Sequence, residues 1–209
     1  MTVLRVAHDV WALVRTRVGD GAAAHPDGTG AHPGDAAAAT GMPGWRADEF
    51  LAGRAVLREL LAAVAPEAAE AHVLAGAYGK PRLAGFPGIA VSVAHDRHTV
   101  TACAARGRAV GIDVQRAPDH LDDAVLRRCL RGRADWQAAL DALPAPARAR
   151  EFAWIWTAQE ACVKAEGIAR GPWAVDVPPG RRTGTWRGLR WRSLRELSRT
   201  PLSCAWKEL

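Results

Sequence analysis

Two side chains of opposite charge stand one helical turn apart in a segment that reads as an amphipathic helix. The segment is Phe152–Gly167 (FAWIWTAQEACVKAEG), and within it Glu160 and Lys164 are spaced i, i+4. A carboxylate and an ammonium at the margin of a buried helix face are suited to bind a charged ligand. An ordinary Glu–Lys pair on a solvated face explains the same spacing, and the helix alone favours that simpler interpretation.

The helix itself is predicted from its ends and from its apolar spacing. Pro144 and Pro146 precede the segment and Gly167 follows it, which are the residues that commonly mark helix starts and stops. At about 100° per residue, one arc of the helix is apolar and is predicted to be buried. This arc consists of Phe152, Ile155, Cys162 and Val163. Trp156, Glu160 and Lys164 form a stripe along its margin.

A second carboxylate, Asp113, lies in the predicted strand Ala109–Val114. Strand alternation puts Gly111, Asp113 and Gln115 on one face. Because glycine has no side chain, we expect room for a ligand to approach Asp113 closely. The alternative is that Asp113 is a structural residue of a buried strand.

Cations and a histidine lie upstream of this strand. The turn Gly79–Leu83 displays Lys80 and Arg82 on a backbone that its proline fixes. His95 follows the predicted strand Ile89–Ala94, where a histidine is more often structural than catalytic.

Three arginines accompany the predicted helix Asp48–Val64: Arg46, Arg54 and Arg58. Arg54 and Arg58 are one turn apart, so they can present a paired cationic surface to a ligand. A solvated basic face explains their spacing at least as well.

The elements around these residues predict an α+β fold with two similar halves, 1–108 and 109–209, forming a single structural unit with the active site between the halves. A flexible loop is predicted at about 19–44, where His25 and His32 are interpreted as incidental rather than as metal ligands. Further strands are predicted at Val3–Val18, His98–Ala105, Trp173–Val177, Gly188–Ser193 and Leu202–Trp206. Further helices are predicted at Leu121–Leu130 and Trp136–Leu143.

Composition restricts the class of protein. The chain has 209 residues, 49% of them apolar and 24% charged, which is ordinary for a globular protein. Its net charge of +6 favours an acidic partner or a phosphate-bearing ligand. Four widely spaced cysteines without a CxxC pair indicate reduced, packed thiols. No signal peptide or membrane-spanning run is apparent, so we expect a cytoplasmic protein that does not bind membranes.

Taken together, four motifs resemble the 4′-phosphopantetheinyl transferases of the surfactin-synthetase type. They are GKPRL at 79–83, SVAH at 92–95, VGIDVQ at 110–115 and WTAQEACVKAEG at 156–167. The resemblance runs from about Trp45 to Gly167, and Trp173–Val177 and Pro201–Ala205 fit the closing strands of the group. Each motif is weak alone, whereas four in register are a specific signal.

The resemblance implies a pseudo-twofold α+β monomer whose halves face each other across a coenzyme A cleft. It implies transfer of 4′-phosphopantetheine from coenzyme A to the serine hydroxyl of an apo acyl or peptidyl carrier protein, giving holo-carrier protein and 3′,5′-ADP. Mg²⁺ is the implied cofactor, with Mn²⁺ as a substitute. Such carrier proteins are characteristically acidic, so the positive charge of this chain would steer the encounter.

The resemblance also implies a catalytic set of Asp113, Glu160, Lys164 and His95. Asp113 and Glu160 match the metal-binding acids, and Gln115 can offer its carbonyl oxygen where the family often has a third acid. Glu160 is the candidate base for the serine proton, directly or through a water. Lys164 is expected to meet the α-phosphate and the leaving 3′,5′-ADP. His95 matches the histidine that contacts the pyrophosphate.

Coenzyme A is expected to bind further cations through its phosphates. Lys80 matches the GKP lysine and, with Arg46 and Arg54, is expected to hold the adenosine 3′-phosphate. The three helix arginines, Arg46, Arg54 and Arg58, match a looser pattern.

The sequence departs from the family in three places. Gln115 replaces a frequent Glu and contributes no charge, Gln159 replaces a usual Lys, and Ala94 and Asp96 replace serines that commonly flank the histidine. We therefore expect metal binding by two carboxylates, with one cation fewer near the phosphates.

Two other functions are compatible with parts of the sequence. A protein of the same fold could hold coenzyme A without turnover, which the two glutamines suggest and the retained Asp113, Glu160 and Lys164 oppose. A nucleic-acid-binding protein would show affinity for DNA or RNA that falls steeply with salt. Only the net charge supports it, because no basic run interleaved with aromatics occurs.

Overall fold

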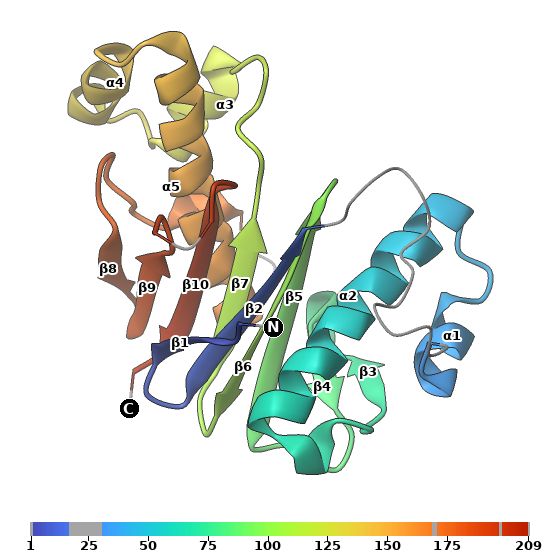
Figure 1. Ribbon diagram of the computed structural model, residues 1–209. Coiled ribbons are helices and arrows are strands. Elements are labelled where there is room, and N and C mark those ends of the chain that lie inside the picture. The colour runs from blue at the N-terminus through green and yellow to red at the C-terminus, as the bar shows by residue number, and fades with distance from the viewer. Residues whose placement is uncertain (1, 17–30, 169–170, 197, 209) are drawn as a thin grey trace. The chain divides into compact units, whose positions relative to one another are not determined.

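The computed structural model describes residues 2–16, 31–168, 171–196 and 198–208. The chain divides into two compact units, Met1–Ala109 and Val110–Leu209. Each unit is an antiparallel sheet with a long helix packed on it (Figure 1), a mixed helix and sheet arrangement consistent with an α+β fold. The two sheets differ in their number of strands, and the predicted pseudo-twofold relation between the halves stays a prediction.

The first unit contains a sheet with the strand order β1-β2-β6-β5-β4-β3. Its strands are β1 (Leu4–Ala7), β2 (Val10–Thr16), β3 (Val73–Ala75), β4 (Pro81–Leu83), β5 (Ile89–Asp96) and β6 (Thr99–Arg106). Its helices are α1 (Pro33–Ala39) and α2 (Gly44–Val64), with the 3₁₀ turns η1 (Pro66–Ala68) and η2 (Ala77–Gly79). Leu57, Leu60 and Leu61 of α2 are fully buried in the core, because α2 packs against β2, β5 and β6.

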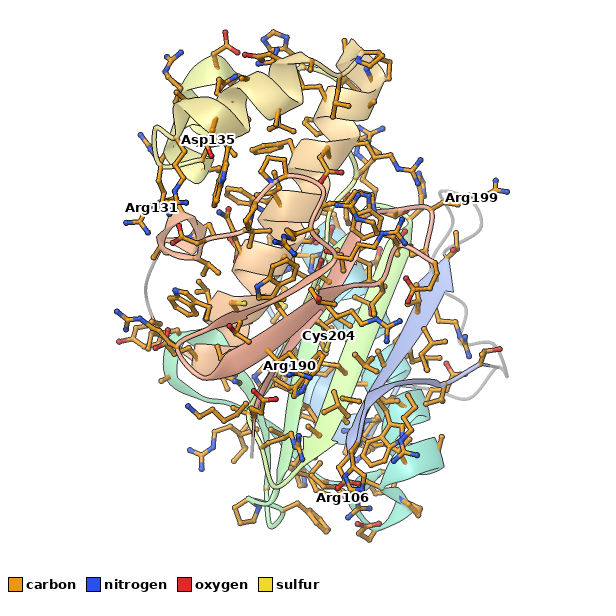
Figure 2. The ribbon with its side chains drawn as sticks, turned by 90° about the vertical axis from the view of Figure 1, so that its left-hand side faces the viewer. Arg106, Arg131, Asp135, Arg190, Arg199 and Cys204 are labelled. Carbon is orange, nitrogen blue, oxygen red and sulfur yellow. The ribbon has the colours of Figure 1, made fainter. Side chains whose placement is uncertain are left out.

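The second unit contains a sheet with the strand order β7-β10-β9-β8. Its strands are β7 (Val110–Val114), β8 (Thr183–Trp186), β9 (Leu189–Ser193) and β10 (Leu202–Lys207). Its helices are α3 (Asp123–Cys129), α4 (Ala134–Asp141) and α5 (Ala145–Glu166), with the 3₁₀ turn η3 (Pro172–Ala174). Cys204 lies on β10, whereas Arg131 and Asp135 lie at the helical end of this unit (Figure 2).

Helix α5 organises the second unit. It packs on β7, β9 and β10 and also contacts α4 and η3, so it is buried on most sides. The predicted apolar arc is buried, and the predicted marginal stripe of Trp156, Glu160 and Lys164 is half-buried. The helix ends at Gly167, which adopts φ 69° and donates its N–H to the Val163 carbonyl. This left-handed ending favours glycine.

Two predictions for the first unit are wrong. Val3–Val18 was expected to be one strand, but β1 and β2 form a hairpin that turns at Asp9, where φ is 55°. Aspartate tolerates this left-handed conformation, so a polar pair between apolar runs marks the turn. Part of the predicted loop 19–44 is helix α1, which begins at Pro33 and is rich in alanine, the best helix former. Residues 17–30, including His25, lie outside the described residues.

Three predictions for the second unit also change. Trp173–Val177 is not a strand: η3 occupies Pro172–Ala174, since its proline favours a helical first position. Helix α5 begins at Ala145, ahead of the predicted start, because its first two turns are mostly exposed and give no apolar period. The edge strand β8 was not predicted.

The four cysteines are buried thiols, as predicted: Cys103, Cys129, Cys162 and Cys204. Burial raises the pKa of Cys129 to about 11 and also raises the pKa of Cys162. Among the described residues, no helix is long and apolar enough to span a membrane.

Candidate functional site

Gly111 brings α5 against β7. A Cβ at this position would lie 2.2 Å from the Ala161 carbonyl oxygen and 2.4 Å from the Ala165 backbone nitrogen. The space beside Gly111 is therefore filled by the helix backbone, and the prediction that it admits a ligand is wrong. The glycine instead permits a close approach between the strand that carries Asp113 and the helix that carries Glu160 and Lys164.

Asp113 and Lys164 meet across this contact. The Nζ of Lys164 donates to Oδ1 of Asp113 at 2.6 Å. The Asp113 side chain is 11% exposed and that of Lys164 33% exposed, so the pair lies at the edge of the core. A charge-assisted bond in such a place is stronger than one between fully solvated groups.

Glu160 lies one helical turn before Lys164 and is half-buried. Burial raises the pKa of Glu160, the negative charge of Asp113 raises it further, and Lys164 partly opposes both effects. Two carboxylates thus share a poorly hydrated place with one ammonium. Such a combination of burial and a specific charged neighbour is typical of functional sites, although structural ion pairs also produce it.

This donor set fits Mg²⁺. The ion prefers carboxylate oxygens and usually binds through one or two of them, with phosphates and water completing its shell. The mutual repulsion of Asp113 and Glu160 is a reason for a cation to bind there. Within the described part of the chain, no group of three or more His, Cys, Asp or Glu side chains could hold a metal, so further ligands would have to come from substrate and solvent.

Two glutamines differ in their surroundings. Gln115 follows β7 directly, is half-buried, and donates its Nε2 to the Arg116 carbonyl at 3.3 Å. Gln159 is fully buried and donates its Nε2 to the carbonyls of Cys129 at 3.0 Å and Val175 at 2.9 Å. The expectation that residue 159 lies among the phosphates is therefore wrong, because its side chain links α5 to the end of α3 and to the segment after η3.

In the first unit, two of the predicted coenzyme A residues are in contact. Arg46 on α2 has its Nη1 3.2 Å from Nε2 of His95 at the end of β5. Glu49, which was not predicted, lies 3.5 Å from Nη1 of Arg46 and 3.7 Å from Nδ1 of His95. Its i, i+3 spacing from Arg46 is a signal that could have identified it.

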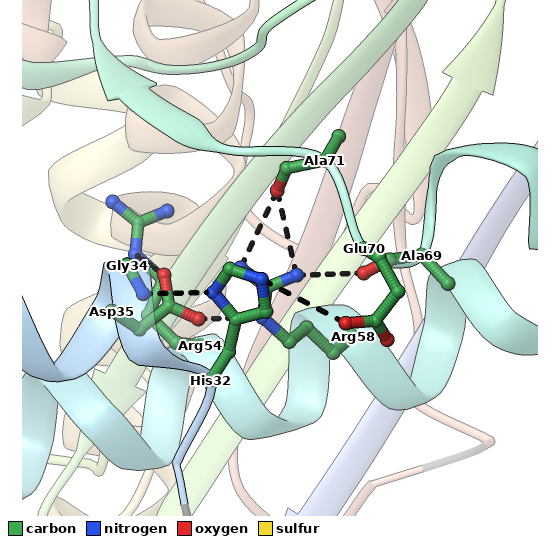
Figure 3. Close-up of polar contacts among 8 residues, drawn as sticks. All are labelled: His32, Gly34, Asp35, Arg54, Arg58, Ala69, Glu70 and Ala71. Carbon is green, nitrogen blue, oxygen red and sulfur yellow. Dashed lines mark hydrogen bonds and ion pairs between the residues drawn. The ribbon is translucent and has the colours of Figure 1, made fainter.

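Arg54 is held elsewhere on α2. Its Nε lies 3.7 Å from Oδ1 of the buried Asp35, and Nε of Arg58 lies 2.6 Å from Oδ2 of the same carboxylate (Figure 3). Burial lowers the pKa of Arg54, with repulsion from Arg58 adding to this effect and Asp35 opposing it. Neither the paired cationic surface nor the solvated basic face is observed, since both guanidinium groups bind Asp35.

The ion pairs of Asp35 hold α1 to α2. Arg58 also donates to the carbonyls of Ala69 at 2.7 Å and Ala71, so one side chain joins α1, α2 and the segment after η1 (Figure 3). His32 accepts from the Gly34 N–H at 3.1 Å and caps α1, which explains this histidine structurally. The expected phosphate contact of Arg54 stays a prediction.

Lys80 lies between η2 and β4, where the Gly76 N–H donates to its carbonyl at 2.8 Å. Burial lowers the pKa of Lys80, because a partly desolvated ammonium is less stable than a hydrated one. A bound phosphate would favour the charged form. The contact of Lys80 with coenzyme A stays a prediction.

The comparisons with known proteins concern the second unit. Residues 109–195 match the family model of the 4′-phosphopantetheinyl transferase superfamily, and this range includes Asp113, Glu160 and Lys164. No curated protein matches the chain. Residues 109–195 are thus similar to the 4′-phosphopantetheinyl transferase superfamily, and this similarity supports transfer of phosphopantetheine in general.

Proposed function

We propose that this protein transfers the 4′-phosphopantetheine group of coenzyme A to a serine hydroxyl of an apo carrier protein in a Mg²⁺-dependent reaction, as surfactin-synthetase-type enzymes do. The observation that carries the proposal is the meeting of Asp113, Glu160 and Lys164 within the segment that matches the superfamily. These are the groups that phosphoryl transfer requires: carboxylates for a metal, a base and a cation for phosphate.

In the proposed reaction, the serine oxygen attacks the phosphorus that bears the pantetheine arm. The bond from this phosphorus to the bridging oxygen breaks, and 3′,5′-ADP leaves with that oxygen. Glu160 accepts the serine proton, directly or through a water. Lys164 offers its ammonium to the α-phosphate of the leaving group.

Asp113 and Glu160 are the proposed metal ligands, with Gln115 as a neutral third donor. When bound, Mg²⁺ would neutralise negative charge on the pyrophosphate. In the protein alone, the Lys164 ammonium neutralises part of the charge on Asp113 and fixes its Oδ1. His95, Arg46, Lys80 and Arg54 are the proposed contacts to the phosphates of coenzyme A.

The proposed acceptor is an acidic acyl or peptidyl carrier protein. The net charge of +6 supports this choice, because opposite charges accelerate association between proteins. The protein is proposed to act as a monomer in the cytoplasm.

Intact mass of an apo carrier protein, measured after incubation with this protein, coenzyme A and Mg²⁺, tests the proposal. We expect a gain of one phosphopantetheine, which EDTA abolishes and excess Mg²⁺ restores. Binding of coenzyme A without transfer to several unrelated carriers would instead favour a non-catalytic protein. Salt-sensitive binding of DNA without binding of coenzyme A would favour the nucleic-acid alternative.

The Lys80→Ala variant tests the coenzyme A contact. We expect a higher KM for coenzyme A with kcat nearly unchanged, because a contact to the adenosine 3′-phosphate is made equally in the ground and transition states. Steady-state rates at a series of coenzyme A concentrations give KM and kcat separately. Arg82→Ala, which removes the exposed cation of the same hairpin, is the matched control. A pure loss of kcat in Lys80→Ala would contradict the assignment.

A further inference from the structure

Glu49 lies among groups that the proposed function assigns to phosphate. It shares α2 with Arg46, three residues earlier, and both side chains face His95 on β5. Its carboxylate oxygens lie 3.5 Å from Nη1 of Arg46 and 3.7 Å from Nδ1 of His95. The Glu49 carboxylate therefore lies where Arg46 and His95 would bind the anion of a ligand.

The contact between Arg46 and His95 indicates which nitrogen of a neutral imidazole carries the proton. A guanidinium only donates hydrogen bonds, so Nε2 of His95 accepts from Nη1 of Arg46 at 3.2 Å. The ring proton of a neutral His95 then lies on Nδ1, the nitrogen on the side of Glu49. In this arrangement Nε2 cannot also donate to a phosphate oxygen, so phosphate binding has to break or replace the contact.

These side chains are accessible enough for replacement. Arg46 is 46% exposed, His95 29% and Glu49 26%, so none is locked in the core. Asp35, by comparison, is 3% exposed and holds Arg54 and Arg58 in a buried cluster. An ion pair as exposed as that of Arg46 and Glu49 is weak and can exchange for a stronger anion.

We propose that Glu49 is an internal counter-ion, which holds Arg46 and His95 in the free protein and which the phosphates of coenzyme A displace. Glu49 then lowers the affinity for phosphate ligands, because its charge both occupies the Arg46 guanidinium and repels the anion. A diphosphate, with more charge than a monoester, competes with Glu49 more effectively. This inference rests on the proposed function for the identity of the ligand.

The Glu49→Gln variant keeps the size of the side chain and removes its charge. We expect the dissociation constants of coenzyme A and of inorganic pyrophosphate, measured by calorimetry on the whole protein, to fall roughly two- to fivefold. The gain should shrink at high salt, since the charges are partly exposed. The matched control is Glu59→Gln, which removes another carboxylate of α2, the partner of Arg15. This variant should leave both dissociation constants unchanged.

A double-mutant cycle separates a counter-ion from a merely structural residue. Arg46→Gln should weaken binding and should also reduce the gain from Glu49→Gln, because the two charges act on each other. Unchanged or weaker pyrophosphate binding in Glu49→Gln would overturn the inference. If the wild-type protein binds pyrophosphate more weakly than Glu49→Gln but never modifies a carrier, the inference stands and the proposed transferase function fails.

Discussion

Asp113→Ala and Glu160→Ala are each expected to lower the rate of phosphopantetheine transfer by about 10²- to 10⁴-fold while leaving the fold largely intact. Asp113→Ala removes a proposed metal ligand and the partner of Lys164. The fold should tolerate the loss, because Lys164 is 33% exposed and its ammonium can be hydrated. Glu160→Ala removes the second carboxylate and the proposed base.

Rates follow from intact mass of the carrier protein, and circular dichroism with thermal melting follows the fold. Asp119→Ala is the control, since this carboxylate is 87% exposed and pairs with the surface residue Arg116. Near-normal turnover in either Asp113→Ala or Glu160→Ala would disprove the metal assignment. Loss of transfer in Asp119→Ala would indicate a nonspecific effect of charge.

Gly111→Ala is expected to destabilise the second unit and to abolish transfer together. The new methyl group would lie 2.2 Å from the Ala161 carbonyl oxygen, and backbone cannot rotate away as a long side chain can. Helix α5 must then move from β7, which separates Lys164 and Glu160 from Asp113. Overpacking of this kind typically costs about 1–3 kcal/mol, and a backbone clash lies at the upper end.

Urea unfolding measures the stability of the variant. Transfer by the folded protein is measured as the intact mass of the carrier protein, without urea and well below the melting temperature. Gly88→Ala is the matched control, because a Cβ there meets no atom within 4 Å. An unchanged urea midpoint for Gly111→Ala would contradict the close packing of α5 on β7. A lower midpoint with normal transfer would show that the packing does not position the site.

Local patterns predicted the elements that carry a strong period or a clear end signal. The buried arc of α5, its stop at Gly167 and the strands β5, β6, β7, β9 and β10 follow from such patterns. Helix α1 could not be predicted in this way, because an alanine-rich stretch beside glycine and proline has no apolar period. Its stability comes from Asp35, whose partners lie 19 and 23 residues later in the chain at Arg54 and Arg58.

The candidate site, like the fold, could be predicted only in part from local patterns. Spacing identified Glu160 and Lys164 as neighbours, and the structure adds that Lys164 binds Asp113. The meaning of Gly111 was missed, because the sequence of a strand does not tell which element packs against it. Gln159 was misplaced for the same reason: its distant partners, the carbonyls of Cys129 and Val175, come together only in the folded unit.

The buried thiols make the opening of each unit separately observable. A thiol alkylates as its thiolate, so burial together with the raised pKa of Cys129 and Cys162 protects these side chains from maleimides while the chain is folded. The first unit contains one cysteine, Cys103, and the second contains Cys129, Cys162 and Cys204. A single adduct in a pulse of reagent therefore reports opening of the first unit, and a set of three reports opening of the second.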